Sequence, residues 1–239
     1  MEIKVTKNYD EMSTVAARTI AREIKANPNL RICFATGGTP IETYQKLIIK
    51  YKEGDIDFSN VTTFNLDEYV GIPIESKCSY HYYMHHHLFD HINVKPENIN
   101  FPNGNGDLIQ NAKDYEAKIA DGGIDFLILG IGTNAHIAFN EPGSQPTEAT
   151  REVKLTQSTI NSNKIYFDSE ADVPKTAISM GIGTILKAKK IILLASGESK
   201  AQAIHDAFWG EVTDKVPASF LQNHPDVTFI IDKDAAKLV

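Results

Sequence analysis

The chain has 239 residues, of which 42% are hydrophobic and 23% charged, as in an ordinary globular protein with a sizeable core. Its formal net charge of −7 argues against a nucleic-acid surface, which needs clustered basic residues, although a small anion can still bind where helix N-termini meet a lysine. With no apolar stretch near the roughly 18 residues of a membrane span, no signal core and only two cysteines, we expect a soluble cytoplasmic protein of one domain, residues 1–239, without membrane or nucleic-acid partners.

The first elements alternate between strand and helix. Alternating apolar residues predict an edge strand over residues 2–6, and helical spacing predicts a helix over 9–26 that the Asn-Pro-Asn sequence after it ends. An apolar run over residues 31–36 predicts the next strand, which leads through a glycine turn into another helix.

That turn, formed by Gly37, Gly38, Thr39 and Pro40, is a candidate anion-binding site. Its glycines leave backbone N–H groups free to point at one spot, and Pro40 suits a first helical turn, where a missing N–H costs nothing. The spacing fits neither the dinucleotide fingerprint nor the P-loop. A tight turn without a ligand has the same sequence, and from the turn alone that alternative is favoured.

A carboxylate candidate follows the strand predicted over residues 61–66. This strand delivers Asp67 and Glu68 at its end, and the carboxyl ends of strands in an open α/β sheet face the ligand crevice. The alternative is that Asp67 caps a turn or a helix, the commoner role of a lone Asp after a strand.

Residues 76–92 carry serine caps and five histidines. His81 and His85 are four residues apart, as are His87 and His91, and such pairs can hold a metal on one helix face. Because no cysteine joins them and no His-Glu-x-x-His motif is present, we interpret the segment as a helix that packs through its apolar residues, with solvated histidines and no metal site.

Residues 125–144 form the centre of the predicted site. A short apolar run from residue 125 to 129, cut by Gly130 and Gly132, predicts a buried parallel strand, and the loop after it carries His136 and Glu141. A histidine beside a carboxylate can move protons near neutral pH. The alternative, an ordinary surface loop, is equally compatible with this one segment.

The second half of the chain continues the alternation. Predicted elements are a helix over residues 109–120, strands over 152–156, 190–195 and 227–231, a partly irregular apolar stretch over 173–186, a helix over 201–209 closed by Gly210, and a short helix from 217 to 222. Gly197 and the N–H groups after it predict a second anion cradle, to which Lys200 adds a charge.

Together these elements predict an α/β fold with a doubly wound, mostly parallel sheet and helices on both faces, a Rossmann-like arrangement. The anion cradles and the proton-transfer candidates all follow predicted strands, so we expect them to meet at one edge of the sheet. This combination is typical of a site that anchors a phosphorylated small molecule at one end and moves a proton at the other. The sequence contains no cofactor motif, and no cofactor is expected.

Six segments in order resemble the glucosamine-6-phosphate deaminase family across nearly the whole chain. They are FATGGTP at 34–40, FNLDEYVG at 64–71, LGIGTNAHIAFNEPG at 129–143, VPKTAISMGIGTIL at 173–186, SGESKAQAI at 196–204 and VPASFLQNHPDV at 216–227. The related 6-phosphogluconolactonases share the fold and the glycine turns, but the FNLDEYVG and AFNEP segments are similar to the deaminase branch.

The resemblance implies conversion of glucosamine 6-phosphate and water to fructose 6-phosphate and ammonia, without metal or cofactor. It implies that Asp67 moves the proton between C2 and C1, that His136 assists opening of the sugar ring and that Glu141 sets the protonation state of His136. It also implies that the phosphate binds Gly37, Gly38, Thr39 and Lys200.

The chain departs from the family pattern at three places. Asn134 and Ala135 replace the usual Asp-Gly before the histidine, and Asn134 can orient His136 but cannot share its charge. Ile165 occupies the usual position of a phosphate-contacting arginine, with Lys164 beside it. The chain also ends soon after its last strand, so we expect a non-allosteric monomer or small oligomer. Galactosamine 6-phosphate as substrate, a 6-phosphogluconolactonase-like hydrolase and a non-catalytic sugar-phosphate sensor remain alternatives.

Overall fold

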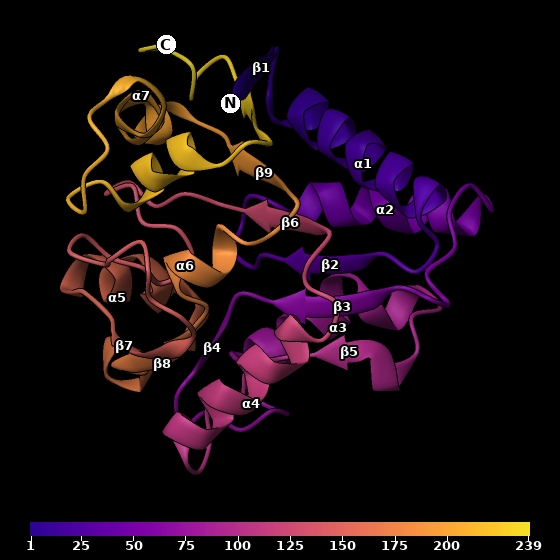
Figure 1. Ribbon diagram of the computed structural model, residues 1–239, viewed down its shortest axis with the longest axis horizontal. Coiled ribbons are helices and arrows are strands. Elements are labelled where there is room, and N and C mark those ends of the chain that lie inside the picture. Colours follow the sequence, from indigo (N-terminus) through magenta and orange to yellow (C-terminus); the bar gives the residue numbers. More distant parts are fainter.

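The computed structural model describes the backbone of residues 1–239 and every side chain except that of Glu170 (Figure 1). Its strands are β1 (Glu2–Thr6), β2 (Arg31–Phe34), β3 (Thr62–Asn65), β4 (Asp67–Tyr69), β5 (Ile99–Asn100), β6 (Phe126–Leu129), β7 (Arg151–Lys154), β8 (Thr176–Ser179), β9 (Lys190–Ala195) and β10 (Val227–Asp232). The α-helices are α1 (Tyr9–Ala26), α2 (Ile41–Lys52), α3 (Tyr80–His87), α4 (Leu108–Ala120), α5 (Gln157–Asn163), α6 (Ile182–Ile185) and α7 (Ala201–Trp209). Short 3-10 helices are η1 (Phe89–His91), η2 (Pro96–Asn98), η3 (Lys164–Tyr166), η4 (Glu170–Asp172), η5 (Glu198–Lys200) and η6 (Pro217–Asn223).

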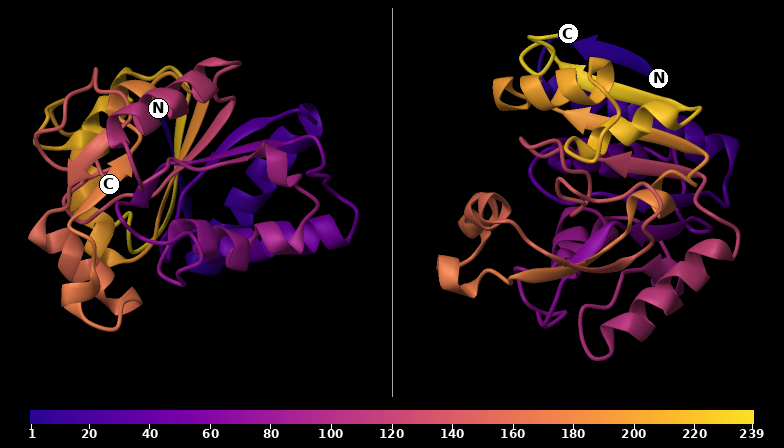
Figure 2. Two further views of the ribbon diagram at one scale, coloured as in Figure 1. Left: turned by 90° about the horizontal axis from the view of Figure 1, so that it is seen from below. Right: turned by 60° about the vertical axis from the view of Figure 1, so that its left-hand side comes forward.

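The main sheet is seven-stranded, in the order β1-β10-β9-β6-β2-β3-β5, and every pairing in it is parallel. Helices flank it on both sides (Figure 2). Since parallel crossovers are right-handed, the order places α1, α2 and α3 on one face and α4 and α7 on the other. This confirms the predicted doubly wound α/β fold.

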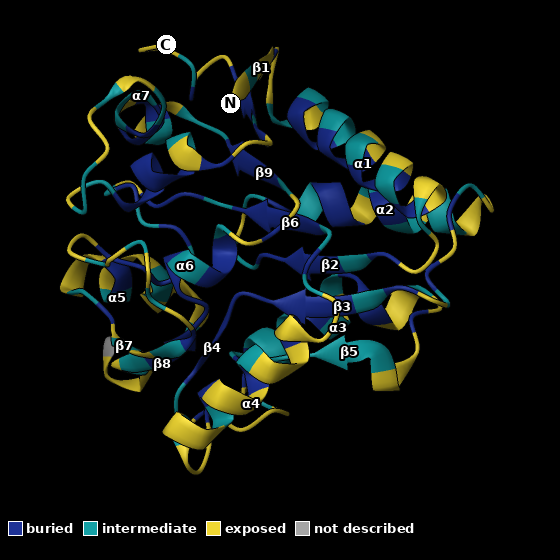
Figure 3. Ribbon diagram, in the orientation of Figure 1, coloured by how far each residue is buried: buried dark blue, intermediate teal, exposed yellow. Residues whose placement is uncertain are grey.

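Burial explains why the central strands have continuous apolar sequences. All four residues of β6 are buried, as are five of the six in β9, because helices cover both faces of the sheet (Figure 3). The surface helices are amphipathic instead: α1 buries Met12, Ala16, Ile20 and Ile24 along one stripe and begins at Asn8, whose side chain accepts from the Glu11 N–H.

A second, three-stranded antiparallel sheet with the order β4-β8-β7 corrects the prediction around Asp67. Asp67 does not end the preceding strand. It begins β4, where it pairs with Ser179 of β8, after the chain has left the main sheet at Leu66. The three residues of β4 are all buried, so this small sheet holds Asp67 inside the molecule at the end of β3.

Several boundaries also differ from the sequence prediction. The strand expected over residues 31–36 ends at Phe34, because Gly37 adopts a positive φ of 96° and the chain turns. The helix expected within 76–92 covers only Tyr80–His87, and it stops at Leu88, whose φ of −146° is not helical. The stretch over 173–186 contains strand β8 and the one-turn helix α6, with Met180 and Gly181 between them.

The main sheet reverses its winding between β2 and β6. The connections after β2 and β3 run toward β5, whereas those after β6 and β9 run toward β1. The loops that follow these two neighbouring strands therefore leave in opposite directions and open a crevice between them, the usual position of a ligand in this fold.

In the described part of the chain, no helix is both long and apolar enough to cross a membrane.

Candidate active site

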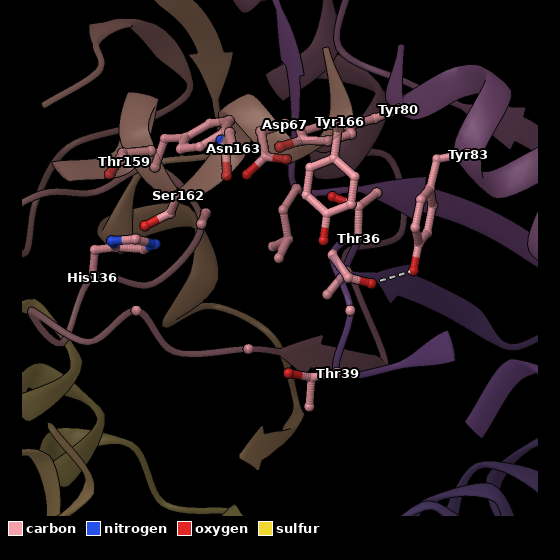
Figure 4. A pocket seen from close by; sticks show the side chains of 18 of the residues that line it. Thr36, Thr39, Asp67, Tyr80, Tyr83, His136, Thr159, Ser162, Asn163 and Tyr166 are labelled. Atoms are coloured by element: carbon pink, nitrogen blue, oxygen red, sulfur yellow. Dashed lines mark hydrogen bonds between the residues drawn. The ribbon is translucent and has the colours of Figure 1, made fainter. Parts of the chain in front are cut away.

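A cavity of about 310 Å³ lies at the carboxyl ends of β2, β3 and β6. Its lining comes from the turn after β2, from Asp67, from the N-terminal turn of α3, from the loop after β6, and from α5, η3 and Lys200. Figure 4 shows Asp67, His136 and Thr39 facing this common space from three elements, with Tyr166 and Tyr83 also pointing into it. The predicted residues Asp67, His136, Asn134, Gly37, Gly38, Thr39 and Lys200 all line it.

Asp67 is the carboxylate among the described residues that line the cavity. Its side chain is 7% exposed, and no described side chain or backbone group donates a hydrogen bond to it. Burial, together with the nearby charge of Glu68, raises the pKa of Asp67 to about 8. A carboxylate in this state accepts protons near neutral pH far better than an ordinary aspartate does.

Glu68, the next residue, points away from the cavity and holds the beginning of α3. Its carboxylate accepts from the backbone N–H groups of Tyr69 at 2.9 Å and of Tyr80 and His81 at 3.0 Å each. Burial raises the pKa of Glu68, while these three hydrogen bonds act to lower it. The sequence had predicted that Glu68, like Asp67, faces the crevice. That was wrong for Glu68, because the N–H groups of residues 80 and 81, which are distant in sequence, hold its carboxylate outside the cavity lining.

His136, Asn134 and Glu141 form a connected group on the other side of the cavity. The Nδ1 of His136 lies 2.8 Å from the Oδ1 of Asn134, and the Nδ2 of Asn134 donates to the Oε2 of Glu141 at 2.7 Å. The Nδ1 of His136 is 3.5 Å from the same Glu141 oxygen. The amide of Asn134 thus bridges the imidazole and the carboxylate.

Glu141 lies one layer behind His136 and does not line the cavity itself. Burial acts to raise its pKa, but the hydrogen bond and charge of His136, with further hydrogen bonds from Thr159 and Asn134, lower the pKa of Glu141 to about 2. Thr159 and Thr156 both donate to its Oε1, the latter at 3.2 Å. Glu141 is therefore a fixed negative charge beside the imidazole over the whole physiological pH range.

The backbone of this loop is shaped to fit the imidazole. A Cβ on Gly132 would lie 2.3 Å from the Cε1 and Nδ1 of His136, so only glycine leaves room for the ring in its present position. Ala135 has a φ of +63°, the left-handed conformation that glycine adopts without strain. Ala135 therefore holds a conformation that usually favours glycine.

The turn after β2 and Lys200 supply the anion-binding groups of the cavity lining. Among the described residues, the N–H groups of Gly37, Gly38 and Thr39 donate to no protein acceptor, and these residues line the cavity. The Nζ of Lys200 donates to the Ile131 carbonyl at 2.7 Å, and burial lowers the pKa of Lys200. The turn and the lysine together can bind an anion.

The second predicted anion cradle, at Gly197, is occupied by the protein's own carboxylate. The Gly197 N–H lies 3.1 Å and 3.3 Å from the two carboxylate oxygens of Asp232, and the Ser196 hydroxyl also donates to Asp232. The prediction of an open cradle there was wrong, because Asp232 accepts from the Gly197 N–H. The sequence does not show this contact, since Asp232 lies at the end of β10, far from Gly197 in the chain. Of that segment, Lys200 alone lines the cavity.

Ile165 is 74% exposed and lies outside the cavity lining, as does Lys164. Its neighbour Tyr166 enters the cavity, and a Cβ on Gly38 would lie 3.8 Å from the Tyr166 hydroxyl oxygen.

Sequence reasoning missed several polar lining residues, for which a single sequence carries no local signal: Lys77, Cys78, Tyr80, Tyr83, Thr133, Ser158, Thr159, Ser162, Asn163 and Tyr166. Within the described residues, no group of three or more His, Cys, Asp or Glu side chains is arranged to hold a metal ion.

A model of the family described as glucosamine-6-phosphate isomerases/6-phosphogluconolactonase matches residues 6–230. The chain belongs to this family. Among curated family members it is 53% identical to a glucosamine-6-phosphate deaminase of Thermoanaerobacter pseudethanolicus, over 100% of this chain and 95% of that protein. It is 51% identical to one of Clostridioides difficile, over 99% and 96% of the two chains.

Solved structures of the family give the same result. A monomeric glucosamine-6-phosphate deaminase superposes with a TM-score of 0.98 at 44% identity, over 100% of both chains. A 6-phosphogluconolactonase from Trypanosoma brucei superposes with a TM-score of 0.79 at 20% identity, over 99% of this chain and 97% of that one. The second likeness shows the shared fold alone.

Proposed function

We propose that the protein is a glucosamine-6-phosphate deaminase, which converts glucosamine 6-phosphate and water into fructose 6-phosphate and ammonia. The observation that carries the proposal is the presence in one cavity lining of the buried Asp67 carboxylate, which accepts no hydrogen bond from a described group, of the free amides of the turn after β2, and of Lys200. Relatives about half identical over the full chain carry the same activity in their names. Because both groups line one cavity, a phosphate bound by the amides and Lys200 would leave the sugar carbons to meet Asp67.

In this proposal Asp67 is the base that moves the proton. After the ring opens, Asp67 takes the proton from C2 of the aldose while the C1 oxygen takes up a proton from water, which leaves a 1,2-enolamine. Asp67 then returns its proton to C1. The resulting iminium carbon at C2 then adds water and expels ammonia, so that the ketose remains. A carboxyl with a pKa of about 8 suits both the uptake and the return of a proton.

His136 is assigned to ring opening, in which it exchanges a proton with the ring oxygen. Asn134 fixes the orientation of its imidazole, and the Glu141 carboxylate stabilises the imidazolium while the proton is held there. The opposite end of the substrate is assigned to Gly37, Gly38, Thr39 and Lys200, which bind the phosphate. Fixing that end positions C1 and C2 for the reaction.

We also propose a monomeric protein acting in the cytoplasm. The monomeric state of the deaminase that superposes with a TM-score of 0.98 supports the first part. Two free cysteines, Cys33 buried and Cys78 partly exposed, are compatible with a reducing compartment.

A panel of sugar phosphates, scored for ammonia release, ketose formation and lactone hydrolysis, tests the proposed reaction. Glucosamine 6-phosphate should yield ammonia and fructose 6-phosphate in equal amounts, and Asp67→Asn should abolish both. Galactosamine 6-phosphate and 6-phosphogluconolactone complete the panel. They are included because no arginine is among the described residues that line the cavity, and Ile165, at the position where the family pattern has one, is exposed. Faster turnover of either would reassign the substrate, and tight binding without turnover would indicate a sensor.

A further inference from the structure

Three tyrosine hydroxyls hold the backbone carbonyls of the turn after β2. Tyr83 of α3 donates to the Gly37 carbonyl at 2.6 Å, and Tyr44 of α2 donates to the Ala35 carbonyl. Tyr9 of α1 lies 2.9 Å from the Thr39 carbonyl oxygen and 3.2 Å from that of Gly38. Three helices that are separate in sequence thus converge on one five-residue turn, and each provides one phenol.

The direction of these carbonyls fixes the direction of the free amides. In a planar trans peptide the C=O and the following N–H point opposite ways. A Gly37 carbonyl directed at Tyr83 therefore turns the Gly38 N–H away from that phenol, and a Gly38 carbonyl near Tyr9 turns the Thr39 N–H likewise. In the described structure these two N–H groups have no protein acceptor, and both residues line the cavity.

We propose that Tyr83 is a positioning residue that aims the Gly38 amide at the anionic group of the substrate, while Tyr9 holds the far end of the same turn, chiefly through the Thr39 carbonyl. The inference rests on the proposed function and deepens it, since it assigns how the phosphate end of the site is held in shape. Tyr83 does not need to touch the phosphate. Its hydroxyl has a single proton, and that proton is used on the Gly37 carbonyl.

The phenol suits this task because it stays neutral. Burial, with smaller contributions from Tyr166 and Tyr9, raises the pKa of Tyr83 far above its ordinary value. The hydroxyl therefore remains a hydrogen-bond donor and never becomes an anion that would repel a phosphate. Figure 4 shows its bond to the turn as a dashed line.

Helix α3 ties this anion-binding turn to the carboxylate end of the cavity. Glu68 is the residue after Asp67, and its carboxylate accepts from the N–H groups of Tyr80 and His81 at the start of the helix. One turn further along, Met84 is completely buried, which anchors the same helix in the core. The helix thus connects the turn at Gly37 and Gly38 to the segment that carries Asp67.

Tyr83→Phe tests the proposal, with Tyr82→Phe as the matched control. Tyr82 lies on the same helix, and no described group receives a hydrogen bond from its hydroxyl. Losing the Tyr83 hydroxyl removes one hydrogen bond that orients the turn, so KM for glucosamine 6-phosphate should rise about 2- to 10-fold while kcat stays within about twofold. The dissociation constant for inorganic phosphate, from a phosphorus NMR titration, should rise by the same factor, and Tyr82→Phe should change neither.

Unchanged KM and phosphate affinity in Tyr83→Phe would overturn the proposal, as would a fall in kcat alone. If Tyr83→Phe fails to fold, Tyr9→Phe decides in its place, because its hydroxyl serves the same turn from a half-buried position. The phosphate titration does not depend on turnover. A parent protein that releases no ammonia would therefore refute the proposed function, and the titration of the variants would still decide the role of Tyr83.

Discussion

The side-chain amide of Asn134 donates to the Oε2 of Glu141 at 2.7 Å and offers its oxygen to the Nδ1 of His136 at 2.8 Å. An amide can do both at once, since it carries a donor and an acceptor. A carboxylate in its place would face Glu141 as a like charge. The amide therefore lets a fully ionised Glu141 lie against its neighbour without repulsion.

Asn134→Asp should make activity more sensitive to high pH. Two carboxylates at this separation cannot both be ionised without repulsion, so the pair should hold one proton, which stands in for the amide hydrogen of Asn134. As that proton is lost the contact opens and His136 loses its orientation. The alkaline limb of the kcat profile should then appear at lower pH than in the parent. An alkaline limb identical to that of the parent would show that the amide proton is dispensable.

Glu68→Gln should shift the acid limb of kcat/KM to lower pH. Burial and the charge of Glu68 hold the pKa of Asp67 near 8, so in the parent the active, ionised form of Asp67 is lost as pH falls below that value. Removing the Glu68 charge leaves burial alone, so the pKa of Asp67 falls and activity persists to more acidic pH. The exposed Glu97→Gln serves as control. A limb that stays in place would mean that Glu68 does not act on Asp67.

Asp67→Asn should stabilise the inactive protein, and more so as pH rises. The pKa of Asp67 is about 8 in the folded protein and about 3.9 in an unfolded chain, so between these values only the unfolded state ionises and the parent loses stability. The variant has no such penalty. The difference in Tm between variant and parent should be small at pH 4, grow up to pH 8 and then level off. The exposed Asp121→Asn should show no such trend, and a trend of the opposite sign in Asp67→Asn would contradict a raised pKa.

Local patterns in the sequence predict most of the main sheet, because buried parallel strands and amphipathic helices have distinct periodicities. Helix α1, strand β9 and helix α7 begin and end as predicted. The small antiparallel sheet was not predicted, since β4 has only three residues and pairs with β8 more than a hundred residues later. The Asp232 carboxylate that accepts from the Gly197 N–H is likewise hidden from local patterns, because it lies 35 residues later in the chain.

The predicted site residues share a property that a single sequence reveals, which is that they lie in the segments that follow strands of the main sheet. Asp67, His136 and the glycine turn follow β3, β6 and β2, so a fold prediction is enough to bring them together. Tyr83 and Tyr166 lie on helical segments whose docking depends on tertiary contacts, and nothing in their neighbourhood distinguishes them from packing aromatics. Sequence reasoning had placed Tyr83 on the packing side of its helix.

Gly132→Ala should reduce kcat about 100-fold with little change in the overall fold. The added Cβ would lie 2.3 Å from the His136 ring, so the ring has to move, and a displacement of about 1 Å at a reacting group costs roughly this factor. Gly130→Ala is the matched control, because nothing lies within 4 Å of a Cβ built there. Circular dichroism and Tm should match the parent in both variants. Full activity in Gly132→Ala would remove the position of His136 from the mechanism.

Lys77→Ala should weaken substrate binding in a salt-dependent way. Lys77 and Lys200 are the two lysines among the described residues that line the cavity. Lys77 is exposed and precedes Cys78, whose Sγ lies 3.1 Å from the Tyr166 carbonyl oxygen. An exposed lysine near a phosphate dianion contributes an attraction that salt screens. KM of the variant should therefore be about 2- to 5-fold above that of the parent at low salt and about equal to it at 0.5 M salt. Lys164→Ala is the control, since Lys164 is exposed and lies outside the cavity lining. Equal effects of the two substitutions would mean that general surface charge attracts the substrate, whereas an effect of Lys164→Ala alone would move the phosphate toward η3.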